Sequence, residues 1–500
     1  MPRPTVPLLR GLVALILAAT TPWLLPASAH ADSPGTFART PAFSGAGQAA
    51  AVFLPGSVED LERAAKVAGA TGAWVQDGTG AFHLMLVGGP AFLKEGFSAR
   101  FAGGFTTATP VTLTRPAGTA PARVFSLDPA ALAATRTRLQ AKDPLLAAAS
   151  ARLLRDADRA MRAGPFAVTD KTKPPPSGDL HDFASQSPYY WPDPAKADGL
   201  PYIYRDGEIN PERDAIPDDR AFGSMTSNTE SLSLAYYFTG DEKYAERAAL
   251  LLRTWFIDPR TKMNPNLNYG QFVPGKNTGT PSGIIDTHDM PQVVDAIGLI
   301  EASPALTSDD RQALAAWFSA YRTWLTTAKL GLDEGKATNN HGTFYDAQVV
   351  SISLYLGDEA RARTVLEAAR ERRIAAQIEP SGQQPRELAR TKAWSYSVFN
   401  LDAMFNLAAL GERAGVDLWN YESPDGRGMR RALDWLVPYA LGSQPWTAQQ
   451  ITPFMPGELY PLLRRASVAY NSAAYRAAAA RIAPTPADAD RRMLTIPIAR

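Results

Sequence analysis

The chain has 500 residues, of which 45% are hydrophobic and 20% are charged, as in ordinary globular proteins. Its formal net charge is +1, so the composition gives no indication of a nucleic-acid partner or of an anionic membrane surface. The chain contains no cysteine, which excludes disulfides, a cysteine nucleophile and thiolate metal sites.

The N-terminus, residues 1–31, has the pattern of a secretory signal peptide. Basic residues Arg3 and Arg10 come first, an apolar stretch follows, and the small-x-small sequence AHA ends at Ala31. Such segments are removed after the small residues. We therefore expect cleavage after Ala31 and a secreted or periplasmic protein. No later segment has about 18 unbroken apolar residues, so we expect no membrane span after signal removal.

Residues 32–120 contain short apolar or alternating runs separated by glycine and proline, such as "AWVQDGTGAFHLMLVGG". This pattern is typical of strands and turns. We predict a small β-rich module, closed by the linker "TRPAGTAPAR".

From residue 121 to residue 500 the pattern becomes helical. Two segments, "LAYYFTGDEKY" and "SLYLGDEAR", share one plan: an apolar helix, a Gly-Asp turn and a second, amphipathic helix. Repeated antiparallel pairs of this kind favour a superhelix or a closed α/α toroid. The first helix of each pair is apolar on most faces, as an inner ring requires. We predict a mainly α fold, an (α/α) toroid preceded by the small β-rich module.

Two long segments, 165–228 and 257–287, have almost no helical periodicity. Loops of about 30 residues inside a compact domain are uncommon and are often functional. Both are rich in residues that stack on sugars or hydrogen-bond to them. Tyr189, Tyr190 and Trp191 are candidates for substrate binding, and packing of the loop itself is the alternative.

The stretch "EGKATNNHGTFYDAQ" places Asn339, Asn340 and His341 directly before an apolar helix. Further on, Arg390 precedes Tyr396 by six residues at the start of another inner helix. In a toroid all of these helix ends face one cleft. Each also has a structural alternative: a helix cap for the amides and the imidazole, a solvated charge for the arginine, and a core aromatic for the tyrosine.

This set of residues fits elimination β to a carboxylate. The α-proton of a carboxylate has a pKa far above neutrality, and an anion resists becoming a dianion. Hydrogen-bond donors such as asparagine, arginine or protonated histidine make the proton removable. A tyrosine or histidine can then act as the base, and a tyrosine can protonate the leaving oxygen.

The same stretches carry a family resemblance. Residues from about 180 to 470 resemble the alginate lyase superfamily, polysaccharide lyases with an α/α toroid. The matching pieces are "SPYYWPDP", "DGEINPERD", "SNTESLSLAYYFTGDEKYAERAALLLRTWF", "DTHDMPQVVDAI", "NNHGTFYDAQ" and "ELARTKAWSYSVFNL". The resemblance implies catalytic roles for Asn340, His341, Arg390 and Tyr396.

Within these pieces Asn228, His288 and Asn339 are further candidates for substrate binding, and His288 is alternatively a helix-capping group. The chain departs from the best-known alginate lyases, whose arginine-to-tyrosine spacing is one residue longer and whose tryptophan two positions after "NNH" is absent here. The substrate is therefore open. Relatives with this pattern also cleave glucuronan and other uronic-acid polymers.

We therefore predict a secreted polysaccharide lyase that cleaves a 1,4-linked uronic-acid polymer by β-elimination, with an anionic polysaccharide as its partner. No cofactor is expected. Asp286, His288 and Asp289 are close in sequence, but no second cluster accompanies them, so no metal is expected. The alternatives are a glycoside hydrolase on the same toroid, with Glu230 and Asp289 as its two carboxylates, and a non-catalytic carbohydrate-binding surface protein.

Overall fold

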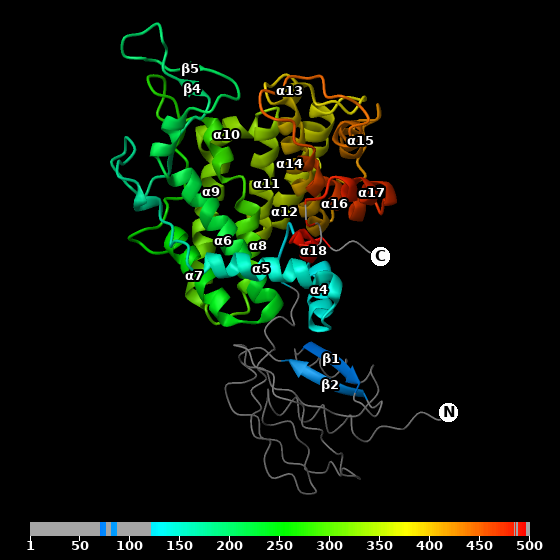
Figure 1. The fold of residues 1–500 in the computed structure, drawn as a ribbon. Helices are drawn as coiled ribbons and strands as arrows, with labels where there is room; N and C mark the ends of the chain where they lie inside the picture. Colours follow the sequence, from blue (N-terminus) through cyan, green and yellow to red (C-terminus); the bar gives the residue numbers. More distant parts are fainter. Residues whose placement is uncertain (1–70, 77–81, 88–121, 485, 487–488, 497–500) are drawn as a thin grey trace, which may run out of the picture. The chain divides into compact units, whose positions relative to one another are not determined.

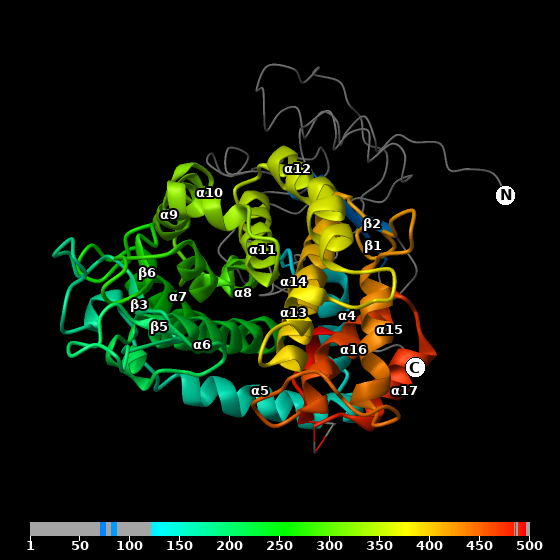
Figure 2. The same cartoon turned by 90° about the horizontal axis from the view of Figure 1, so that it is seen from above.

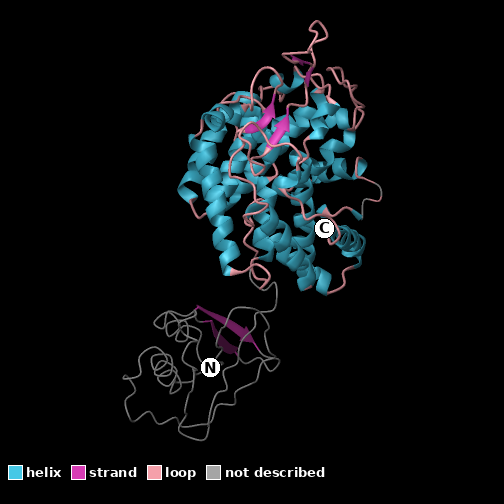
Figure 3. Ribbon diagram, turned by 90° about the vertical axis from the view of Figure 1, so that its left-hand side faces the viewer, coloured by secondary structure: helices cyan, strands magenta, loops and turns pink. Residues whose placement is uncertain are grey.

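The structure is a computed structural model, and it describes residues 71–76, 82–87, 122–484, 486 and 489–496. The chain divides into two compact units, Met1–Thr119 with Ala302–Pro304, and Ala120–Glu301 with Ala305–Arg500. In the first unit β1 (Thr71–Gln76) and β2 (Phe82–Val87) form an antiparallel hairpin (Figure 3). The expected signal peptide, and the rest of the expected β-rich module, lie outside the described residues.

The second unit is mainly helical (Figures 1 and 3). Its helices in chain order are α4 (Pro129–Gln140), α5 (Ala147–Ala160), α6 (Asp218–Thr239), α7 (Glu242–Phe256), α8 (Met290–Ile300), α9 (Ser308–Thr327), α10 (Lys329–Gly335), α11 (Asn340–Tyr355), α12 (Glu359–Ala369), α13 (Pro385–Leu388), α14 (Ala393–Ala414), α15 (Met429–Ala440), α16 (Tyr460–Ala469), α17 (Ala473–Arg481) and α18 (Arg492–Thr495). None of these described helices combines the length and the apolar character that crossing a membrane requires.

The two long loops contribute short strands and single turns of 3₁₀-helix. β3 (Ala184–Gln186) pairs in parallel with β6 (Tyr269–Phe272), and β4 (Tyr190–Trp191) pairs antiparallel with β5 (Ile203–Tyr204). The 3₁₀ turns are Pro144–Leu146, Val168–Asp170, Pro211–Ala215, Pro281–Thr287 and Pro456–Leu459. A π-helical turn, Arg370–Ala375, continues α12.

The predicted Gly-Asp turns join two helix pairs. Gly240 ends α6 in the left-handed conformation, with φ +75°, and Asp241 then caps α7 by accepting a hydrogen bond from the Lys243 backbone N–H. Gly357, with φ +76°, and Asp358 repeat this arrangement between α11 and α12. A left-handed glycine followed by an acidic cap reverses the chain within two residues, so the two helices of each pair lie antiparallel.

The inner helices follow one another around the unit (Figure 2). α6 contacts α8, α8 contacts α11, α11 contacts α14, and α14 contacts α16, while α7, α12 and α17 each pack on the inner helix that precedes them. In α11 every side chain except that of His341 is buried, whereas α12 buries only Ala362, Leu366 and Ala369. This succession of inner and outer helices is consistent with an α/α toroid.

Helix α11 belongs to both hydrophobic cores of the helical unit. Val349 and Ile352 pack in the cluster built mainly from α4 to α9, and Val350 and Leu354 pack in the cluster built mainly from α12 to α17. Because a helix turns by 100° per residue, side chains one or two positions apart point to different sides of α11. The residues at the N-terminus of α11 are therefore held from two sides.

A buried ion pair fixes the chain just before α11. The guanidinium of Arg373 donates from Nε to Asp346 at 2.7 Å, and from its other nitrogens to the carbonyl oxygens of Ala337 and Gly335. Arg373 is 1% exposed and Asp346 is 0% exposed. A Cβ at Gly342 would lie 2.3 Å from Nη1 of Arg373, so the glycine gives the arginine room to pass.

We expect Arg373→Met to lower the free energy of unfolding by about 3–5 kcal/mol, because the buried Asp346 carboxylate loses one of its two guanidinium partners and two buried carbonyl oxygens lose their donor. Arg372, which also donates to Asp346, remains. Denaturant unfolding followed by circular dichroism measures this change. The matched control is Arg361→Met, whose exposed pair with Asp358 is expected to contribute about 0–1 kcal/mol. A loss below about 1 kcal/mol for Arg373→Met would contradict the structural role given to this pair.

Candidate active site

The first residue of α11 is tied to a buried carboxylate. Glu387, at the end of the short helix α13, accepts hydrogen bonds from the backbone N–H and from the side-chain Nδ2 of Asn340, both at 2.9 Å. Both residues are 1% exposed. Because a carboxylate only accepts, Nδ2 of Asn340 must face Glu387, which leaves one Nδ2 hydrogen free. The Asn340 Oδ1 atom has no hydrogen-bond partner among the described residues.

Burial raises the pKa of Glu387 above its usual value, and the hydrogen bonds from Asn340 counteract only part of that rise. The charges of Arg390 and His341 also act on Glu387. Glu387 thus ties the first residue of α11 to the short helix that precedes Arg390.

His341 contacts a second carboxylate that has little solvent access. Its Nδ1 lies 2.7 Å from Oε1 of Glu334, whose side chain is 3% exposed, whereas the histidine side chain is 21% exposed. A carboxylate oxygen accepts, so Nδ1 carries the hydrogen in this contact. The other ring nitrogen, Nε2, is then the atom that can accept a proton.

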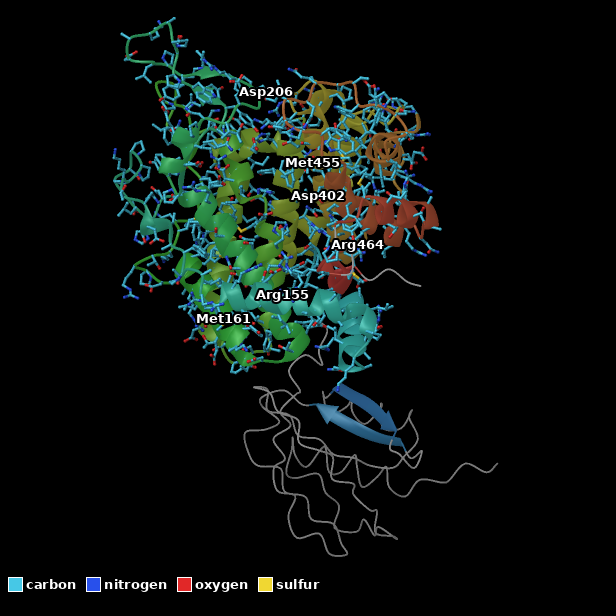
Figure 4. All side chains as sticks on the ribbon, in the orientation of Figure 1. Arg155, Met161, Asp206, Asp402, Met455 and Arg464 are labelled. Carbon is cyan, nitrogen blue, oxygen red and sulfur yellow. The ribbon has the colours of Figure 1, made fainter. Side chains whose placement is uncertain are left out.

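Arg390 is paired with the loop that bears β4 and β5. Its Nε and Nη2 donate to Oδ1 of Asp206, at 2.9 and 2.6 Å, while the other carboxylate oxygen accepts from the backbone N–H of Thr391. Burial alone would raise the pKa of Asp206, but the hydrogen bonds from Arg390 and Thr391 outweigh it and hold that pKa well below its usual range. Asp206 lies at the same end of the helical unit as β4 and β5 (Figures 1 and 4).

Tyr396 is one turn into α14 and lies against Arg390. The guanidinium carbon is 3.7 Å from the centre of the tyrosine ring, which is a close cation–π contact. The hydroxyl of Tyr396 is 2.6 Å from the hydroxyl of Tyr189, and either can donate. Burial, with a further contribution from Tyr189, raises the pKa of Tyr396 above its ordinary value. Its hydroxyl is therefore protonated at neutral pH.

A cavity of about 840 Å³ runs along the inner face of α14. At one end it is lined by Tyr189, Lys392 and Tyr396, and further along the helix by Asp402 and Glu412. With a rise of 1.5 Å per residue, the stretch from Tyr396 to Glu412 is about 24 Å long. Tyr189 and Tyr396 therefore line the end of the cavity near the start of α14.

His288 is held between three inner helices. It precedes α8, and its ring centre is 5.0 Å from that of Phe344 on α11 and 5.5 Å from that of Phe399 on α14. Its Nδ1 lies 2.8 Å from the Ile285 carbonyl oxygen, to which it donates, and its Nε2 is 3.4 Å from a carboxylate oxygen of Asp289. In the described residues no group of three or more acidic or histidine side chains is arranged to hold a metal ion.

The remaining predicted binding residues lie around this region. Asn339 is at the cap position of α11 but makes no side-chain capping bond, and Asn228 donates to the Ser224 carbonyl of its own helix α6. Trp191 donates its indole N–H to the Glu208 carbonyl, within the loop, and Tyr190 lies across the hairpin from Tyr204. Neither Tyr190 nor Trp191 lines the described cavity, whereas Tyr189 does.

Three partner carboxylates were not identified from the sequence, namely Glu334, Glu387 and Asp206. Glu334 is seven residues before His341 in the quoted stretch, and Glu387 lies in "ELARTKAW". Asp206 opens "DGEINPERD". Their places in these stretches were the available signal, but their partners follow only from the folded chain.

The chain is similar to known proteins in sequence and in fold. Residues 167–446 match the family model described as alginate lyase. A crystal structure of an alginate lyase from Bacteroides ovatus shares 41% sequence identity, covers 76% of this chain and 100% of that chain, and gives a TM-score of 0.73. The chain belongs to the alginate lyase family. It is therefore a polysaccharide lyase.

Other solved structures of alginate lyases are more distant from this family member. Alginate lyase A1-III from Sphingomonas species A1 is 16% identical, with 75% of this chain and 96% of that chain covered and a TM-score of 0.49. A variant of A1-III complexed with a tetrasaccharide is 17% identical, with 72% and 91% covered and a TM-score of 0.48. Among curated proteins no significant match was found.

In this polysaccharide lyase we expect Glu334→Gln to lower kcat by on the order of 100-fold, because glutamine keeps the shape but removes the charge that stabilises a protonated His341. KM should change by less than about two-fold if the substrate does not touch Glu334. Initial-rate kinetics measure both constants, and the exposed Glu359→Gln on α12 is the control for the same substitution. A Glu334→Gln enzyme with unchanged kcat would show that Glu334 only packs against the histidine.

Proposed function

We propose that this protein depolymerises alginate, or a related 1,4-linked polyuronate such as glucuronan, by β-elimination on an α/α toroid. The observation that carries the proposal is a set of three donors fixed by carboxylates. Asn340 donates to Glu387, His341 to Glu334 and Arg390 to Asp206, and the Arg390 guanidinium lies against the ring of Tyr396. Family membership supports a lyase over the hydrolase and the binding protein that the sequence left open.

The first step removes the proton at C5 of a uronate. Its carboxylate must be neutralised as charge develops, and preorganised donors do this at least cost. Asn340 has one Nδ2 hydrogen that Glu387 does not use. Arg390 donates from Nε and Nη2 to Asp206, and its Nη1 can donate to the uronate carboxylate. These two groups are our candidates for binding the carboxylate.

His341 is our candidate for the base and Tyr396 for the acid. With Nδ1 directed at Glu334, the imidazole can take the C5 proton on Nε2. The electron pair of the C5–H bond forms the C4–C5 double bond, and the C4–O bond breaks. The leaving oxygen takes the proton of Tyr396, whose raised pKa keeps it protonated. If the C5 proton is instead syn to the leaving group, Tyr396 first loses its own proton to solvent, then takes the C5 proton as the base and passes it to the leaving oxygen.

Product analysis tests the proposal. Incubation with alginate, glucuronan and a neutral polysaccharide is followed by ultraviolet absorbance of the unsaturated sugar and by reducing ends. A lyase raises both signals on a polyuronate, a hydrolase raises only the reducing ends, and a binding protein raises neither. Reducing ends without absorbance, or no reaction on any polyuronate, would overturn the proposed function.

We expect Tyr396→Phe to reduce turnover at least 100-fold while leaving the thermal midpoint nearly unchanged, because only the proton-carrying hydroxyl is lost. Asn340→Ala should lower kcat by about 100- to 1000-fold with little effect on KM, if its donor acts mainly in the transition state. Rates and melting curves are measured together. If Tyr396→Phe keeps more than about a tenth of the rate, the tyrosine is not the acid.

Export is part of the proposal. It rests on the basic and apolar pattern of residues 1–31 and on the small residues that end at Ala31. N-terminal sequencing of the protein recovered from the medium or the periplasm of its host tests this point, since cleavage predicts a mature chain that begins at Asp32. An intact N-terminus in the exported protein would contradict it.

A further inference from the structure

Lys392 is a half-buried cation at the end of the cavity near the start of α14. It occupies the cap position of α14, one turn before Tyr396, and lines the same cavity as Tyr189 and Tyr396. Its Nζ is 5.6 Å from the centre of the Tyr189 ring, whose hydroxyl contacts that of Tyr396. The ammonium group therefore lies beside Tyr189, the hydrogen-bond partner of the proposed acid.

The backbone of Lys392 is fixed from two sides. It forms a bridge with Gln450, and the next residue, Ala393, donates to the Gln449 carbonyl. Gly207, with φ +74°, lies against its stem, because a Cβ there would be 3.2 Å from Cε of Lys392. The side chain thus passes between two loops on its way to the cavity.

No carboxylate of the described residues forms an ion pair with Lys392. Its neighbour Arg390, by contrast, is paired with Asp206. A half-buried ammonium without an anion loses hydration without Coulombic compensation, which an arriving anion would supply. Lys276 is also close to a tyrosine ring, that of Tyr190, but it is exposed and does not line the cavity.

The charge along the cavity gives a direction to an anionic ligand. Beyond Phe399 the lining includes the carboxylates of Asp402 and Glu412, and Asp402 lies deeper in the helical unit than Asp206 (Figure 4). Arg465 pairs with Asp402, at 3.3 Å. The carboxylate of Asp402 is thus offset by a cation, whereas the ammonium of Lys392 has no ion-pair partner among the described residues, which favours an anionic group at the Lys392 end of the cavity.

We propose that Lys392 binds a carboxylate of a uronate adjacent to the one that reacts, and that it thereby favours polyuronates over neutral glycans. The inference rests on the proposed function, because it takes the ligand to be a polyuronate. Lysine acts here as a point charge on a flexible stem, which suits a carboxylate whose exact angle varies with the sugar. Asn340 and Arg390 remain available for the carboxylate of the reacting uronate.

The test measures binding separately from turnover. Calorimetry gives Kd for a saturated tetra-uronate in the Tyr396→Phe background, with and without Lys392→Met. We expect Kd to rise roughly 10-fold or more on loss of the charged partner. Lys392→Arg should stay within about three-fold of the parent, since it keeps the charge. Kd of the parent should also rise more steeply with salt than that of Lys392→Met.

Lys243→Met is the matched control, because Lys243 pairs with Asp241 at the start of α7 and the net charge changes equally. Melting curves accompany each variant, and Lys392→Gln replaces Lys392→Met if the latter unfolds. An unchanged Kd for Lys392→Met, or no binding by the parent, overturns the inference. The absorbance assay on the unsubstituted enzyme tests the proposed function separately. If Lys392→Met leaves Kd unchanged but the unsubstituted enzyme still forms unsaturated sugar, only the inference about Lys392 fails.

Discussion

The buried pair of Arg373 and Asp346 is the constraint on which the site depends. A guanidinium with 1% exposure must place its donors on protein acceptors, and here it uses a carboxylate of α11 and two carbonyls of the turn before that helix. These hydrogen bonds fix the backbone conformation between Glu334 and His341. Gly342 is part of the same arrangement, since any side chain there would occupy the space of the guanidinium.

Each of three proposed functional groups is backed by a carboxylate. Asn340 has Glu387, His341 has Glu334, and Arg390 has Asp206. Burying these acids costs free energy, but it fixes the direction of an amide, the tautomer of an imidazole and the plane of a guanidinium before a substrate arrives. Asp206 also neutralises the guanidinium it orients, whereas Lys392 is a cation of the same region with no ion-pair partner among the described residues.

The sequence was sufficient for local features. Glycine followed by aspartate predicted the turns at Gly240 and Gly357, because only a left-handed residue and a capping side chain reverse a helix so tightly. It was insufficient for the partners of the site residues. Arg390 follows Glu387 by three residues, yet the arginine bonds to Asp206, 184 positions earlier, and Glu387 bonds to Asn340, 47 positions earlier. Such pairings are set by loop paths, which no local pattern encodes.

The sharing of α11 between two hydrophobic clusters bears on cooperativity. If one half of the helical unit loses its packing, α11 loses the contacts on one of its sides, and the other half packs against the same helix. Partial unfolding that leaves half of the unit folded therefore costs much free energy. The free energy of opening measured at the interior α11 amides should approach the free energy of unfolding of the whole helical unit. The amides in the interior of α11 are thus among the last to exchange their hydrogens, whereas its first turn, where His341 reaches solvent, lacks intrahelical acceptors for its N–H groups and can exchange earlier.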